Sequence, residues 1–230
     1  MFRTGGPYEL TPSGRVSKTF EQFVSERVEQ GGVTTNLLFE AGMYSLSNDL
    51  EGIVKVLRDA GVRFEVVGGV AVNAHIFTKN RSRSFVTRDI ALLLHRTDLE
   101  CVAKAAGALG FAARKMMGGF MLVRPDQDAA EAVHILFVGE KSKSTQPLPH
   151  PELFPEEKRL FDLSVPVAPL TDLLQMKLNA FRPRDLAHLE TLDDLGLISS
   201  TMEKQLPPIL WERLKEARRQ IAASKPDIEG

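Results

Sequence analysis

Apolar residues recur every three or four positions in two stretches near the start of the chain, residues 17–30 and residues 46–60. This spacing places the apolar side chains on one face and predicts two amphipathic helices. The stripe of the second helix consists of Leu50, Ile53, Val54 and Leu57. Gly61 follows its last turn, where glycine commonly ends a helix. The first helix, residues 17–30, is expected to dock on another part of the protein. Residues 1–45 are thus expected to form a leader and this docking helix.

Shorter apolar runs bounded by turn residues predict β-strands. These runs lie at residues 63–67, 89–95, 132–138 and 165–167. Residues 112–124 predict further strands, with a hairpin turn at Gly118-Gly119. Helical spacing at residues 70–77 and 98–109 separates successive strands. The middle of the chain is therefore expected to form one sheet with few helices between its strands.

The last third of the chain has a helical pattern. Residues 141–155 are rich in Lys, Ser and Pro and predict a linker. Helices are expected over residues 172–180 and 185–195, and a last helix carries Trp211, Leu214, Ala217 and Ile221 on one face. This order predicts an α+β fold, a mixed β-sheet with flanking helices and a helical C-terminal lobe. The expected parts are the leader with its docking helix (1–45), a core (46–140), a linker (141–164) and the helical lobe (165–230).

Composition narrows the class of protein. The chain has 230 residues, of which 43% are hydrophobic and 26% charged, so it can bury a sizeable core. Its formal net charge is -1, which excludes attraction to nucleic acid through overall charge. The single cysteine, Cys101, excludes an internal disulfide framework and is expected in the core. With neither a signal-like segment nor an apolar run of about 18 residues, we expect no membrane span and a cytoplasmic protein.

Three features that can carry chemistry follow one another along the chain. Gly68-Gly69 lies between a predicted strand and a predicted helix, where two glycines allow close approach of another group to the backbone. A helix start also suits a phosphate group. Thr87-Arg88-Asp89 begins the next predicted strand, and His134 is at the centre of the later strand 132–138.

In this order the features resemble the nucleotidyltransferase superfamily. The closer resemblance is to its minimal nucleotidyltransferase and AbiEii toxin-like branch, whose pattern runs Gly-Gly-x-Ala, then His, then Thr-x-Asp-Ile-Asp. Here the matching residues are Gly68-Gly69, Ala71, His75 and Thr87 to Ile90. A later series of Lys177, Ala180, Arg182 and Arg184-Asp185 is similar to the helices that follow in the family. The resemblance covers residues 50–198, and it implies a nucleotidyltransferase-like core. In this core we expect residues 63–67, 89–95 and 132–138 to form neighbouring strands of one sheet, with the side chains of Asp89 and His134 on the same face.

The resemblance implies a reaction and a set of site residues. In the family a hydroxyl attacks the α-phosphate of a nucleoside triphosphate, and two Mg²⁺ ions hold the attacking and leaving oxygens. The nucleotide-binding residues implied here are Gly68, Gly69, Arg83, Lys177 and Arg182. We expect these residues to line a cleft between the sheet and the helical lobe, together with Asp89.

The chain departs from the family at the metal site. Carboxylates two residues apart on a strand share one face, and Asp89 matches the first of them as the catalytic acid of an active enzyme. Ala91 occupies the second position, and His134 occupies the place of the third carboxylate on a neighbouring strand. Mg²⁺ is therefore expected only if other carboxylates complete the site. Glu131 would face the opposite side of its strand, and nothing in the pattern places Asp126 or Asp128 near Asp89.

Three functions stay open at this stage. In the first, metal-dependent transfer is weakened or lost and the protein binds a nucleotide, an RNA or a protein partner; the missing carboxylates favour it. In the second, it is an active Mg²⁺-dependent enzyme of the toxin–antitoxin type that modifies RNA ends or protein hydroxyls. In the third, Asp89, His134 and His75 hold one transition-metal ion, because imidazole suits such metals. Structural roles compete with all three: His134 can be a core residue, and Lys177 and Arg182 solvated helix positions.

Overall fold

A computed structural model describes residues 36–116, 119–125, 132–160 and 163–224. Residues from Leu46 onwards belong to one compact unit, which contains the whole sheet and is described here by itself. The docking helix expected at residues 17–30 lies outside the described residues, as do Asp126, Asp128 and Glu131. The proposed division of the chain into four parts stays a prediction.

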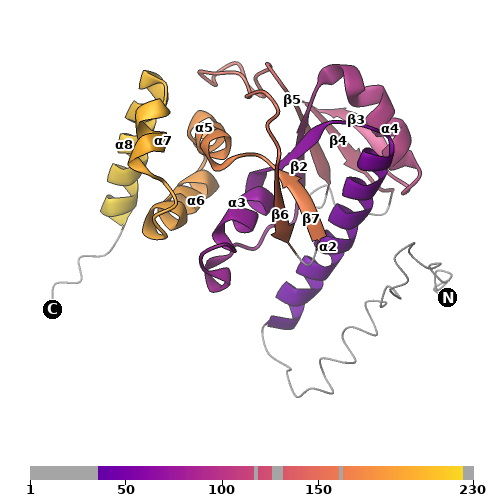
Figure 1. Cartoon of the computed structure of the whole chain (residues 1–230), viewed down its shortest axis with the longest axis horizontal. Helices are drawn as coiled ribbons and strands as arrows, with labels where there is room; N and C mark the ends of the chain where they lie inside the picture. The colour runs from indigo at the N-terminus through magenta and orange to yellow at the C-terminus, as the bar shows by residue number, and fades with distance from the viewer. Residues whose placement is uncertain (1–35, 117–118, 126–131, 161–162, 225–230) are drawn as a thin grey trace. The chain divides into compact units, whose positions relative to one another are not determined.

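The described elements follow the expected order and add three features (Figure 1). The helices are α2 (Asn36–Asp59), α3 (Gly68–Ile76), α4 (Leu99–Gly107), α5 (Leu170–Ala180), α6 (Pro183–Asp194), α7 (Ser200–Gln205) and α8 (Pro208–Ser224). The strands are β1 (Phe64–Val67), β2 (Ile90–Leu94), β3 (Ala112–Met116), β4 (Gly119–Val123), β5 (Val133–Phe137), β6 (Glu156–Leu160) and β7 (Leu163–Val167). The sequence pattern did not predict β6, α7 or the first ten residues of α2.

All seven strands form one mixed sheet in the order β3-β4-β5-β2-β1-β7-β6. β2 runs parallel to β5 and antiparallel to β1, and β1 runs parallel to β7. The expectation that residues 63–67, 89–95 and 132–138 form neighbouring strands is confirmed. The α+β class, with flanking helices and helices towards the C-terminus, is confirmed as well.

The strand missed by the sequence pattern lies at the edge of the sheet. β6 consists of Glu-Glu-Lys-Arg-Leu, and within it only Leu160 is buried. Edge strands commonly carry charged side chains, because these oppose pairing with another chain. A pattern search for apolar alternation therefore misses such a strand.

One apolar cluster joins α3 to the helices near the C-terminus. Val72 and Ile76 of α3 pack in it with residues of α5, α6 and α8, among which Leu178, Leu189 and Leu214 have no exposed surface. Figure 1 shows α5 and α6 beside α3, with α7 and α8 on their far side from the sheet. Burial of this cluster sets the position of α5 and α6 over the sheet.

Two expectations concern the surface. Cys101 is exposed, so the prediction of a core position is wrong; α4 buries only Val102 and Ala106. Among the helices of the described residues, no stretch has the length and apolar character needed to cross a membrane.

Glu65 is a charged residue in the interior of the central strand β1. Its side chain has no exposed surface; Oε1 accepts a hydrogen bond from the Phe154 amide, and Oε2 is buried with no hydrogen-bond partner among the described residues. Burial raises the pKa of Glu65 to about 7, against the opposing hydrogen bond from Phe154. The folded protein therefore retains a proton that the unfolded chain loses at lower pH.

We expect Glu65→Gln to remove part of the pH dependence of stability. The stability from the protonated carboxyl is fully present below the unfolded pKa near 4.5 and is lost as pH rises through about 7. The difference in unfolding free energy between variant and wild type should grow by about 1 kcal/mol per pH unit across that window. Urea unfolding from pH 4.5 to 8 measures it. Glu51→Gln, at an exposed site, should show no such trend, and parallel curves for wild type and Glu65→Gln would contradict the assignment.

Candidate functional site

A cavity of about 780 Å³ lies between the sheet and the helices α5 and α6. The end of β1, the segment 85–89, β2 and β5 form its sheet side, and α5 and α6 form its opposite wall. Of the residues expected at the site from the sequence, it brings together Gly68, Gly69, Asp89, His134, Lys177 and Arg182. Thr87, Arg88 and Arg184, which belong to the motifs but were given no role in binding, line it too. The sequence pattern missed other lining residues: Phe85, Val86, Met116, Lys143 and His188.

The two glycines allow close packing between the start of α3 and the strand β2. Gly68 has a φ of +72°, a conformation that favours glycine, and a Cβ there would lie 3.2 Å from the Cβ of Ala91. A Cβ on Gly69 would lie 2.7 Å from the Thr87 hydroxyl oxygen. That hydroxyl in turn donates to Asp89 Oδ1 at 3.1 Å. The glycine pair therefore positions the carboxylate of Asp89 beside the start of α3.

Strand pairing decides which side chains lie next to Asp89. β2 and β5 run parallel, with Ala91 opposite His134, and Asp89 shares the face of Ala91. His134 Nε2 lies 4.0 Å from Asp89 Oδ2. The sequence-based prediction that Asp89 and His134 point to the same face is confirmed.

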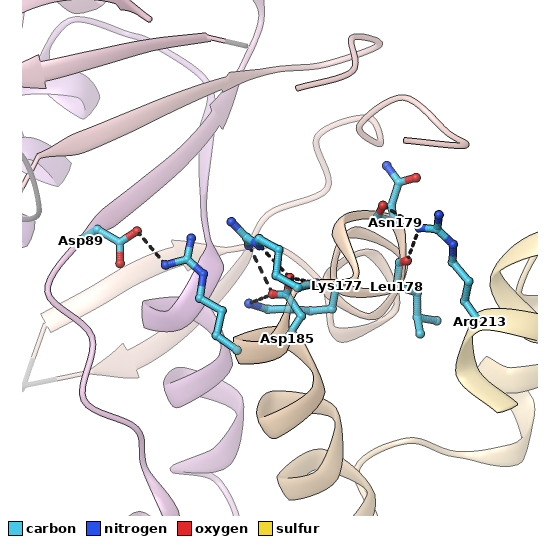
Figure 2. A network of polar contacts seen from close by, with 8 residues as sticks. Asp89, Lys177, Leu178, Asn179, Asp185 and Arg213 are labelled. Carbon is cyan, nitrogen blue, oxygen red and sulfur yellow. Dashed lines mark hydrogen bonds and ion pairs between the residues drawn. The ribbon is translucent and has the colours of Figure 1, made fainter. Parts of the chain in front are cut away.

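A second basic group reaches Asp89 from the opposite wall. Arg184 Nη1, on α6, lies 4.0 Å from Asp89 Oδ2, and 58% of the Arg184 side chain is exposed. Figure 2 shows the ion pair of Asp89, which joins the segment before β2 to the helix α6. Burial lowers the pKa of His134 below its usual value, the charge of Asp89 opposes this shift, and Arg184 and Arg182 add to it. His134 is therefore neutral at neutral pH, and Arg184 is the cation that faces Asp89.

A buried ion pair supports the basic wall (Figure 2). Lys177 Nζ donates to Asp185 Oδ1 at 3.0 Å, and the two side chains are 5% and 0% exposed. Arg182 donates to Asp185 from its backbone N–H at 3.1 Å and from Nε at 2.8 Å. Burial alone would raise the pKa of Asp185, but the hydrogen bonds from Arg182 and the charge of Lys177 hold it below its usual value. Lys177 therefore lines the cavity with its charge already paired.

Two asparagines hold the loops that border the cavity. Asn73 of α3 donates to the Phe85 carbonyl at 2.8 Å and accepts from the Phe85 amide at 2.9 Å. Asn179 of α5 forms the same reciprocal pair with Leu148, at 2.6 and 2.9 Å. Beside Asn179, Arg213 of α8 donates to the carbonyls of Leu178 and Asn179, both at 2.8 Å (Figure 2). Both loops are therefore anchored to helices that form the cavity.

The structure places two predicted residues elsewhere. Arg83 is not a lining residue; its guanidinium pairs with Asp194 of α6 at 2.9 Å. The sequence pattern hides this partner, because it is 111 positions away. His75 is 4% exposed and its Nε2 contacts the Ala168 carbonyl at 2.9 Å, so it does not join Asp89 and His134.

The lining residues carry an excess of positive charge. The cavity has five basic side chains, Arg88, Lys143, Lys177, Arg182 and Arg184, and one carboxylate, Asp89. Even with the buried Asp185 counted against Lys177, cations remain in excess, although the whole chain has a net charge of -1. Such an arrangement favours an anionic ligand.

The residues of the cavity do not fit a pair of Mg²⁺ ions. Within the described residues, no group of three or more His, Cys, Asp or Glu side chains is arranged to hold a metal. Mg²⁺ takes oxygen ligands and is held by one or two carboxylates together with phosphates. Asp89 offers one carboxylate, and the Arg184 guanidinium already faces it.

No family model matches the chain, and no curated protein sequence matches it. Similar solved structures include the solution structure of the antibiotic-resistance factor ANT(2″)-Ia, at 15% identity over 77% of this chain and 92% of that one, with a TM-score of 0.47. A crystal structure of ANT(2″)-Ia with adenylyl-2″-tobramycin is 12% identical over 78% and 95%, with a TM-score of 0.41. The Megavirus polyadenylate synthase is 14% identical over 86% of this chain and 40% of that one, with a TM-score of 0.46.

The resemblance of the motifs to the nucleotidyltransferase superfamily stays a prediction. Nothing in these solved structures bears on the AbiEii toxin-like branch. Because these three TM-scores are below 0.5, the likeness carries no argument about this chain.

We expect Asp185→Asn to destabilise the protein by about 3 kcal/mol, because it leaves the Lys177 ammonium buried without its counter-ion. Urea unfolding at pH 7 measures the loss. The matched control is Asp194→Asn, which breaks the half-exposed pair with Arg83 and should cost less than about 1 kcal/mol. Equal losses in the two variants would contradict the central role of Asp185.

Proposed function

We propose that this protein is a nucleotidyltransferase-fold protein that binds a nucleotide without metal and has lost metal-dependent nucleotidyl transfer. One observation carries the proposal. Asp89, which matches the first carboxylate of the family motif, is faced by the Arg184 guanidinium and the His134 imidazole, each at 4.0 Å, where an active member would gather further carboxylates. A fixed cation in that place attracts phosphate directly.

The basic wall supports phosphate as the group that is bound. Arg182 is the N-cap of α6 and Arg184 lies in its first turn; both line the cavity, and their side chains are 43% and 58% exposed. Guanidinium groups donate paired hydrogen bonds to phosphate oxygens. Lys177 contributes indirectly. Its ammonium group pairs with the Asp185 carboxylate, and that carboxylate orients the Arg182 side chain. A phosphate that approaches Arg184 competes with Asp89 for the guanidinium.

Nucleotides are the proposed ligands, and a terminal phosphate of RNA has the same chemistry. A protein partner remains an alternative, for which the exposed apolar side chains Val86 and Met116 at the cavity offer contacts. We place the protein in the cytoplasm, in agreement with its single cysteine.

We expect ATP, GTP, CTP or UTP to bind the full chain in EDTA, and Mg²⁺ not to strengthen the binding. Arg184→Gln should weaken binding about tenfold, the effect of a lost charged hydrogen bond. Isothermal titration calorimetry measures both effects. Arg219→Gln, which removes an exposed arginine of α8 outside the cavity, is the control. Binding that requires Mg²⁺ would contradict the proposal.

The second candidate is an active Mg²⁺-dependent nucleotidyltransferase of the toxin–antitoxin type, in the AbiEii-like branch. It is favoured by Asp89 and by the glycine pair beside it, which match the family motif. It requires carboxylates beyond Asp89, and no described residue of the cavity lining supplies one.

We expect the wild type to transfer no radiolabelled nucleotide to RNA or protein in the presence of Mg²⁺. The double variant Ala91→Asp and His134→Asp should bind Mn²⁺ more tightly than the wild type, because it places three carboxylates on one face of β2 and β5. Calorimetry measures the metal affinity. Transfer by the wild type that disappears in Asp89→Ala would establish the active enzyme instead.

A further inference from the structure

His188 lies on α6, one turn after Arg184, and lines the same cavity. Residues four apart share a helix face, so the two side chains project from the same side of α6. The His188 ring packs edge-on against Phe85, with ring centroids 4.5 Å apart and an interplanar angle of 66°. Since Asn73 holds Phe85 by two hydrogen bonds, the orientation of the imidazole is set before any ligand arrives.

The imidazole of His188 is a neutral hydrogen-bond donor. Burial lowers its pKa to about 4, and the charges of Lys177, Arg184 and Arg182 add to this shift. Nδ1 is buried and has no hydrogen-bond partner among the described residues, so a proton on Nδ1 would have no acceptor. The proton of the neutral ring therefore belongs on Nε2, and the residue, which is 8% exposed, lines the cavity.

The spacing on α6 limits what such a donor can bind. Four residues of helix rise about 6 Å, so a ligand group that contacts His188 lies about one helix turn along α6 from the phosphate that Arg184 binds. A neutral N–H beside three cations selects an oxygen acceptor. In a nucleotide, a few covalent bonds separate the 5′-phosphate from the ribose hydroxyls, whose oxygens accept hydrogen bonds.

We infer that His188 is a specificity-determining residue that donates a hydrogen bond from Nε2 to a ribose hydroxyl of the nucleotide whose phosphates Arg182 and Arg184 bind. This inference rests on the proposed function and adds the class of ligand, a nucleotide that carries both ribose hydroxyls in preference to one that lacks the hydroxyl bound by His188.

The test is calorimetric titration of the full chain with ATP, 2′-deoxy-ATP and 3′-deoxy-ATP in EDTA. We expect the wild type to bind ATP about fivefold more tightly than one of the two deoxy forms, the effect of one neutral hydrogen bond. His188→Phe keeps the ring and removes the donor, so it should bind all three with equal affinity. His188→Gln keeps an N–H donor and should retain part of the preference. His95→Gln, at a histidine outside the cavity lining, should behave as the wild type.

The outcomes separate the two proposals. Equal affinity of the wild type for the three nucleotides overturns the role of His188 and leaves nucleotide binding intact. A preference that survives unchanged in His188→Phe also overturns it. If neither ATP nor pyrophosphate binds the wild type, the proposed function fails, and the inference fails with it. Thermal unfolding of each variant establishes that it is folded, and if His188→Phe does not fold, loss of the preference in His188→Ala decides.

Discussion

The polar wall of the cavity depends on one buried carboxylate. Asp185 has no exposed surface, and a charge taken out of water destabilises a fold by several kcal/mol unless it is paired and hydrogen-bonded. Lys177 from α5 and both the backbone and side chain of Arg182 supply those partners. Because the bonds span the junction of α5 and α6, they set the angle between the helices. The directions of Arg184 and His188 follow from that angle.

The sheet and the helical wall give the cavity its asymmetric chemistry. The sheet side provides a single carboxylate, Asp89, which a threonine and two glycines position beside the start of α3. The helical side provides guanidinium groups and a neutral imidazole. A metal site needs acidic side chains to converge, whereas here one carboxylate lies in a cavity with an excess of basic side chains. That inversion of charge supports a binding protein for an anion more than a metal-dependent enzyme.

Part of the site could be predicted from the sequence because it depends on local periodicity. The alternation of side chains along a strand places Asp89 and Ala91 on one face. The resemblance to the nucleotidyltransferase pattern led us to expect β2 and β5 as neighbours, and the structure pairs them. The glycine pair was recognisable because it interrupts a strand and starts a helix. Arg184 and His188 carried a weaker signal, a spacing of four residues in a helical stretch, which alone does not show the face that meets the sheet.

The sequence by itself determined the α+β class and the order of most elements, since hydrophobic periodicity is a property of neighbours along the chain. Only the tertiary structure decided the state of each charged group. Arg83, which belongs to a basic cluster in the sequence, pairs with Asp194, whereas Arg184 faces Asp89. Likewise, burial that comes from distant elements raises the pKa of Glu65 and lowers that of His188. The partner of a charged group and the solvent around it are set when the helices pack on the sheet. That packing brings together residues that are far apart in the chain, so the local pattern does not contain this information.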